Sequence, residues 1–153
     1  MSWLENKIPP PIVVLLVAAA MWPLAGVAPR LPLDGLARWI AASVLGLGGL
    51  FVLRAGVQRF RHAATTINPV NIEAASTLVT SGIFAYTRNP MYVGMTLLLL
   101  GWAAVLGGAW SLLGPLVFVL WINRFQIVPE ERVLSAKFGP RYEAYRKNVR
   151  RWI

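Results

Sequence analysis

Four long apolar runs constrain the fold of this chain more than any other feature of its sequence. They cover residues 12–28, 36–57, 91–107 and 110–128. Hydrophobic residues make up 57% of the 153 residues, and charged residues make up only 14%. A helix needs about 20 apolar residues, with about 17 as a lower limit, to cross the hydrocarbon core of a bilayer. The runs therefore predict an all-α, polytopic membrane protein with four transmembrane helices, built as one domain over residues 1–153.

The connections between the runs differ in length. Only the short segment 107–109 links the last two runs, which predicts a tight antiparallel hairpin of helices. Residues 58–89 form a long polar loop, and a loop of this length usually has a function. Ala42, Gly46 and Gly49 recur at helical spacing in the second run. Such small residues allow close helix packing in lipid, or alternatively leave a groove between helices.

The distribution of basic residues predicts the orientation. With four spans, 13 of the 15 Lys and Arg residues fall on the side of the N-terminus, the long loop and the tail 129–153. Only Arg30 and Arg38 fall on the other side. The positive-inside rule then places both termini and the loop in the cytoplasm, and we expect a bacterial inner-membrane protein. The net charge of +9 is explained by topology and lipid headgroups, for which the run 146–152 is a candidate, rather than by nucleic acid.

Residues 87–92, with the sequence TRNPMY, lie where the loop meets the third run. Asn is a preferred N-cap, and Pro suits the first helical position, so Asn89 and Pro90 predict a helix start. A helix start also offers free N–H groups and partial positive charge to an anion. Arg88 adds a cation beside it, so the same stretch is a candidate anion site at the membrane surface.

A second polar cluster follows the fourth run, where Glu130 and Glu131 precede an amphipathic segment. Acids favour helix N-termini, so one interpretation is that both only stabilise the start of a new helix after Pro129. The predicted hairpin, however, returns this cluster to the membrane face that holds Arg88. The alternative is therefore a shared site, in which a zwitterionic ligand with hydroxyl groups would use both charges.

Two motifs at this spacing carry a family resemblance. Residues 78–94 read LVTSGIFAYTRNPMYVG, and residues 130–149 read EERVLSAKFGPRYEAYRKNV. Together they resemble the isoprenylcysteine carboxyl methyltransferase and phospholipid N-methyltransferase superfamily of integral membrane enzymes, over roughly residues 65–149. The matching positions are Gly82, Arg88, Asn89, Pro90, Tyr92 and Gly94, then Glu130, Glu131, Leu134, Phe138, Gly139, Tyr142 and Tyr145.

This resemblance implies an S-adenosylmethionine-dependent methyltransferase whose cofactor lies at the cytosolic face. Carried over by position, the implied cofactor-binding residues are Arg88, Asn89, Pro90, Tyr92, Glu130 and Glu131, and Arg88, Glu130 and Glu131 are also the implied catalytic residues. The acceptor is expected to be lipophilic or membrane-partitioned, and an amine, a carboxylate and a thiol all remain open. Asn89 replaces the His of eukaryotic members, and Phe84 stands where Tyr is usual.

Other chemistries have little support in the sequence. There is no Cys, so thiolate metal sites and a Cys nucleophile are excluded. The single His, His62, follows a basic run and is expected at the surface, so no metal site is predicted. The alternative function is a non-catalytic membrane scaffold or assembly protein that keeps the methyltransferase fold.

Overall fold

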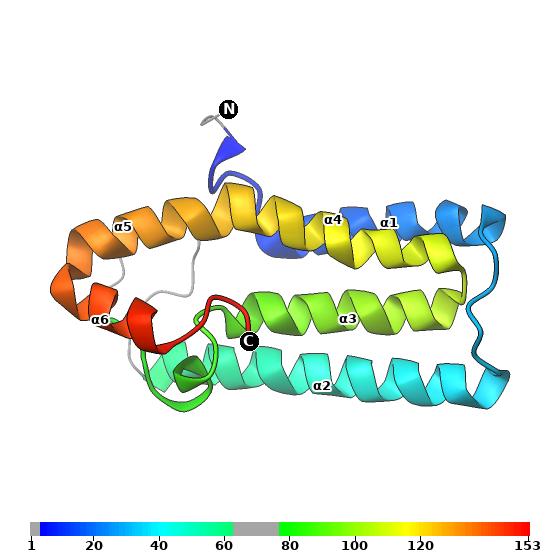
Figure 1. Cartoon of the computed structure of the whole chain (residues 1–153), viewed down its shortest axis with the longest axis horizontal. Coiled ribbons are helices and arrows are strands. Elements are labelled where there is room, and N and C mark those ends of the chain that lie inside the picture. The colour runs from blue at the N-terminus through cyan, green and yellow to red at the C-terminus, as the bar shows by residue number, and fades with distance from the viewer. Residues whose placement is uncertain (1–3, 63–76) are drawn as a thin grey trace.

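The computed structural model of this chain describes residues 4–62 and 77–153, and every regular element in these ranges is helical. The long helices α1, α2, α3 and α4 lie side by side (Figure 1). The elements are α1 (Pro10–Val27), α2 (Gly35–His62), the short helix η3 (Gly82–Ala85), α3 (Pro90–Leu106), η4 (Ala109–Leu112), α4 (Leu113–Ile122), the π-helix η5 (Asn123–Ile127), α5 (Val128–Phe138) and α6 (Pro140–Asn148). The predicted all-α fold class is confirmed.

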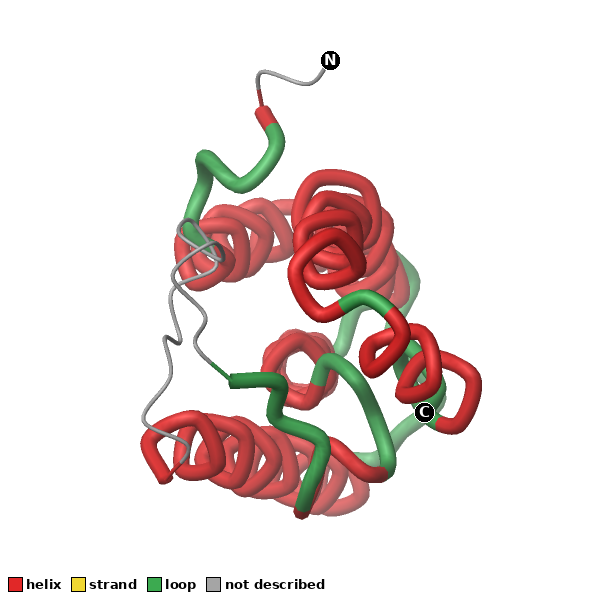
Figure 2. Tube along the Cα trace, turned by 90° about the vertical axis from the view of Figure 1, so that its left-hand side faces the viewer, coloured by secondary structure: helices red, strands yellow, loops and turns green. Residues whose placement is uncertain are grey.

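Helix α3 is the centre of the bundle. It contacts α1, α2 and α4. Figure 2 views the bundle from the end at the left of Figure 1, and shows one helix enclosed by the others. The links between α1 and α2 and between α3 and α4 lie at one end of the bundle, and α5, α6 and residues 77–89 lie at the other (Figure 1). The motif-bearing segments therefore gather at one end, as the predicted hairpin requires.

Small residues bring α2 and α3 into backbone contact. A Cβ atom added to Gly49 would lie 2.8 Å from the carbonyl oxygen of Gly94, and one added to Gly94 would lie 2.7 Å from that of Gly49. Further along, a Cβ on Gly101 would lie 3.2 Å from the Ala42 oxygen and from the Gly46 nitrogen. Gly49 therefore serves close packing of α2 against α3, whereas a Cβ on Gly46 would meet nothing within 4 Å.

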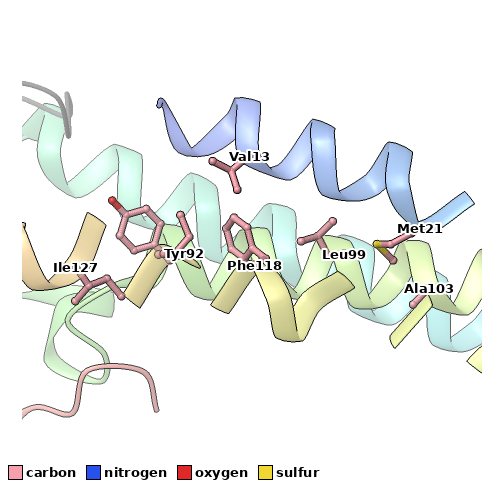
Figure 3. Close-up of a cluster of buried hydrophobic side chains, with 8 residues drawn as sticks. Val13, Met21, Tyr92, Leu99, Ala103, Phe118 and Ile127 are labelled. Atoms are coloured by element: carbon pink, nitrogen blue, oxygen red, sulfur yellow. The ribbon is translucent and has the colours of Figure 1, made fainter. Parts of the chain in front are cut away.

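The buried core follows the axis of the bundle. Phe118 and Leu99 pack with Met21 and Ala103 toward one end of the core, and Tyr92 and Ile127 lie at the other (Figure 3). The outward face of α2 is apolar, and no other helix of the described residues covers it. Leu47 and Phe51 on this face are 68% and 70% exposed. An apolar exterior around a bundle of apolar helices suits burial in lipid, where such a surface has no cost.

Three helices of the described residues are long and apolar enough to cross a membrane: Pro10–Val27, Gly35–His62 and Ala109–Phe138. Helix α3 is shorter, with 17 residues, or about 25 Å at about 1.5 Å per residue. Helix α2 continues five residues beyond its predicted end at 57, because Gln58–His62 are helical rather than loop. The rest of the predicted loop includes residues 63–76, which lie outside the described residues.

Glu130 and Glu131 lie in the first turn of α5, as the sequence predicts, but α5 follows the preceding helix without a break. The chain stays helical from Leu113 to Phe138, and Ile127 before α5 has helical torsion angles of −64° and −46°. The N–H groups of this first turn are therefore not free, and no side-chain capping hydrogen bond forms there. Pro129 has no N–H to donate to the carbonyl of Phe125, four residues earlier. That carbonyl instead accepts the backbone N–H of Asn6 at 3.0 Å, and the helix widens into the π-turn just before Pro129.

Candidate functional site

A cavity of about 320 Å³ lies at the end of the bundle that holds α5 and α6. Its wall is mainly apolar and comes from α1 (Pro10, Pro11), α2 (Leu53, Val57, Phe60), α3 (Met91, Met95), residues 77–84 and α6. All six residues that the sequence predicts for the site also lie in this wall: Arg88, Asn89, Pro90, Tyr92, Glu130 and Glu131. A concave, mostly apolar cavity with a few polar groups is the usual form of a small-molecule site.

The start of α3 positions the first group of these residues. Helix α3 begins at Pro90, as predicted, with Asn89 in the N-cap position. The side chain of Asn89 does not cap the helix; its amide donates instead to the carbonyl oxygen of Arg151 at 2.9 Å. The N-cap hydrogen bond expected from the sequence is therefore replaced by a bond to the C-terminal segment.

The C-terminal segment docks against this helix start. The backbone N–H of Arg88 donates to the carbonyl of Arg150 at 3.0 Å, and the hydroxyl of Thr87 donates to that of Arg151 at 3.4 Å. The indole N–H of Trp152 donates to the side chain of Asn123 in the π-turn at 3.1 Å. Part of the run 146–152, expected to bind lipid headgroups, is thus bound to the protein itself.

Three charged side chains meet where these segments converge. Glu131 accepts Arg88 Nη2 at 3.0 Å, Arg151 Nη2 at 2.6 Å and Arg151 Nε at 3.1 Å. The side chains of Arg88 and Glu131 are only 10% and 11% exposed. The hydrogen bonds to Glu131 raise the pKa of Arg151 above its usual value, so this arginine stays charged. Hydrogen bonds between such charged groups are shorter and stronger than neutral ones.

Two hydrogen-bond donors of the Arg88 guanidinium have no partner among the described residues. Its Nε and Nη1 atoms are buried and have no hydrogen-bond partner among the described residues, while Nη2 holds Glu131. Leaving a buried donor unpaired is unfavourable by about 1–3 kcal/mol, and by more when the group is charged. Arg88 also lies in the cavity wall, so an anionic ligand group that reached these two atoms would satisfy them.

The second carboxylate has a different environment. Glu130 Oε1 accepts the hydroxyl of Tyr92 at 2.5 Å, which joins α5 to the first turn of α3. Glu130 forms no ion pair among residues 4–62 and 77–153, whereas its neighbour Glu131 contacts two arginines. The two adjacent acids therefore offer different chemistry to a ligand, one paired and one facing an apolar cavity.

Two tyrosines of α6 complete the wall. Burial, with the nearby charge of Glu131, raises the pKa of Tyr142 to about 12, and burial also raises the pKa of Tyr145. Both hydroxyls therefore stay protonated at neutral pH. Tyr145 donates to the carbonyl of Phe84 at 2.6 Å, and the ring of Phe84 packs edge-on against Phe60 at 5.2 Å between ring centroids.

The sequence prediction of the site omitted three residues that the structure brings to this cluster or cavity. Tyr142 and Tyr145 matched the family motif but were not assigned to the site, so the resemblance contained the signal that would have found them. Arg151 lay in a basic run whose composition suggested only a surface role. His62, in contrast, is exposed at the end of α2, as expected.

A bundle of apolar helices with a charged cluster beside an apolar cavity at one end defines the class: an integral membrane protein with a candidate small-molecule site at one end of its bundle. The chain belongs to the phospholipid methyltransferase family, whose family model matches residues 36–141. This assignment confirms the resemblance seen in the two motifs, and family membership points to a methyltransferase.

Relatives match over shorter stretches. An uncharacterized protein of Haemophilus influenzae is 46% identical over 63 residues, which are 41% of this chain and the whole of that protein. A protein-S-isoprenylcysteine O-methyltransferase of Schizosaccharomyces pombe is 43% identical over 75 residues, or 47% of this chain. The matched stretch spans only 30% of that enzyme, so its whole activity does not transfer directly. No solved structure matches this chain.

Proposed function

We propose that this protein transfers a methyl group from S-adenosylmethionine to a lipophilic or membrane-partitioned acceptor at the cytoplasmic face of the membrane. The observation that carries the proposal is on Arg88, in the wall of an apolar cavity, where two buried donors have no partner among residues 4–62 and 77–153. A scaffold that binds no small molecule would gain nothing from leaving these donors unpaired. Membership of the phospholipid methyltransferase family supports the same reaction class.

The residues of the cavity suit the cofactor group by group. The Arg88 donors suit its carboxylate, since a guanidinium can offer two parallel N–H groups. Glu130 forms no ion pair among the described residues, so its carboxylate suits the ammonium group or the ribose hydroxyls of the cofactor. Apolar side chains such as Leu134 and Phe84 suit the adenine ring.

S-adenosylmethionine supplies a methyl group on a positively charged sulfur, and methyl transfer to an acceptor neutralises that charge. The protein needs to hold the acceptor in line with the methyl group and to exclude water. Positioning alone can contribute about 7–11 kcal/mol to lowering the barrier. An apolar wall disfavours the charged sulfonium relative to the transition state, in which that charge is partly lost.

The acceptor meets this site from the bilayer side in the proposed arrangement. The cavity wall includes residues of α1 and α2, both candidate spans, and the outward face of α2 is apolar. An amine, a carboxylate or a thiol would each serve as nucleophile. An ammonium must first lose a proton, and Glu130 is the carboxylate available to accept it.

The experiment that tests the proposal is transfer of a labelled methyl group from S-adenosylmethionine. The purified protein is incubated with a total lipid extract and, separately, with a panel of soluble thiols and amines. We expect label in the lipid fraction. Label confined to water-soluble products would refute the bilayer-side acceptor and leave the methyltransferase in place, whereas no label in any product would contradict the proposed reaction.

A further inference from the structure

Arg151 holds the carboxylate against which Arg88 is aligned. Its Nη2 and Nε atoms contact the two oxygens of Glu131 at 2.6 Å and 3.1 Å, and both bonds are side chain to side chain. Its backbone is fixed independently, because the Arg151 carbonyl accepts from Asn89 and Thr87. Arg151 is not part of the cavity wall, so its side chain acts on a ligand through Glu131, which is part of that wall.

The charge of the cluster depends on this residue. Arg88 and Arg151 share a single carboxylate, which leaves one positive charge in excess. Without Arg151, Glu131 would neutralise Arg88 completely. The freed carboxylate would also be able to bind Arg88 through two parallel N–H groups, the arrangement that guanidinium and carboxylate groups prefer. Either change would remove the free donors that a ligand anion would use.

We propose that Arg151 is a positioning residue of an anion-binding site: by binding both oxygens of Glu131, it leaves Nε and Nη1 of Arg88 free for a carboxylate of the ligand. This inference rests on the proposed function, because the anion is then the carboxylate of the cofactor. It adds a role for the C-terminal segment, which supports the site from outside the cavity through a side chain that holds Glu131.

The test compares three variants in detergent. Arg151→Gln removes the charge, Arg151→Lys keeps the charge but loses the two-fold contact, and Arg150→Gln removes an exposed neighbouring charge as the control. S-adenosylhomocysteine is titrated into each. We expect Arg151→Gln to weaken binding about tenfold or more, Arg151→Lys to recover part of the affinity, and Arg150→Gln to match the unaltered protein. Equal affinity for Arg151→Gln and the unaltered protein would overturn the proposal.

A second readout needs no cofactor. With nitrogen-15 in its arginines, the protein gives an Nε–H resonance for Arg88, assigned by its loss in Arg88→Lys. We expect this resonance to move downfield in Arg151→Gln, as Glu131 turns to it, and to stay in place in Arg150→Gln. An unmoved resonance in Arg151→Gln would overturn the positioning role. If the unaltered protein binds no S-adenosylhomocysteine, the proposed function fails, and the resonance still decides the role of Arg151.

Discussion

Replacing Gly49 by alanine should push α2 and α3 apart, whereas the same replacement at Gly48 should not. A Cβ on Gly49 would lie 2.8 Å from the Gly94 oxygen and 3.1 Å from the Leu98 nitrogen, both of them backbone atoms that cannot rotate away. A Cβ on Gly48 meets nothing within 4 Å. Both glycines lie in α2, so the gain in helix propensity is the same in the two variants and cancels. The difference between them should therefore equal the overpacking term, about 1–3 kcal/mol.

The assay is unfolding of both variants in the same detergent, followed by circular dichroism. We expect Gly49→Ala to be less stable than Gly48→Ala by that amount. We also expect Gly49→Ala to alter the cavity, because α2 contributes Leu53 and Val57 to its wall. Equal stability of the two variants would refute the contact between α2 and α3 on which the placement of the site depends.

Three further outcomes are expected. Tyr145→Phe should lower the free energy of unfolding by about 1 kcal/mol in a denaturant titration, because the carbonyl of Phe84 loses its partner. The hydroxyl of Tyr142 makes no hydrogen bond among the described residues, so Tyr142→Phe should lower the free energy of unfolding less in the same titration. Hydrogen bonding from Arg124 lowers the pKa of Glu5, so Glu5 stabilises the fold above the ordinary pKa of Glu; the stability difference between the protein and Glu5→Gln should vanish as the pH falls through that lowered pKa. Reporter fusions at the two ends of the chain should both report the cytoplasm, and opposite signals would contradict the four-span arrangement.

Local patterns in the sequence were enough to predict most of the helices. Apolar runs predict membrane helices because lipid demands a continuous apolar surface, and the Asn89–Pro90 pair predicted the start of α3 correctly. The continuous helix through Pro129 could not be predicted, because the Phe125 carbonyl that Pro129 leaves without a helical donor is satisfied by the N–H of Asn6, far away in the chain. Local rules treat Pro129 as a break, and only the folded chain supplies the missing partner.

The candidate site shows the same division. The resemblance was sufficient to predict which motif residues share one cavity wall, since all six lie there. It did not predict that Glu131 is paired with both Arg88 and Arg151. Local sequence patterns do not show where the chain runs after α6, and so they could not place Arg151 beside Glu131. From the sequence alone, a basic run is interpreted as a solvent-exposed surface. Only the structure shows that Arg151 in this run binds Glu131.

The most direct test of the account is titration calorimetry of the purified protein with S-adenosylhomocysteine, the demethylated product of the proposed cofactor. We predict saturable binding, weakened by about 1.5–3 kcal/mol in Arg88→Ala and in Glu131→Gln, because each variant loses a charge-assisted hydrogen bond or the group that orients one. Arg150→Gln, with an exposed side chain, should bind as tightly as the unaltered protein. Absence of binding, or unchanged affinity in both site variants, would contradict the central claim that this cavity holds the methyl donor.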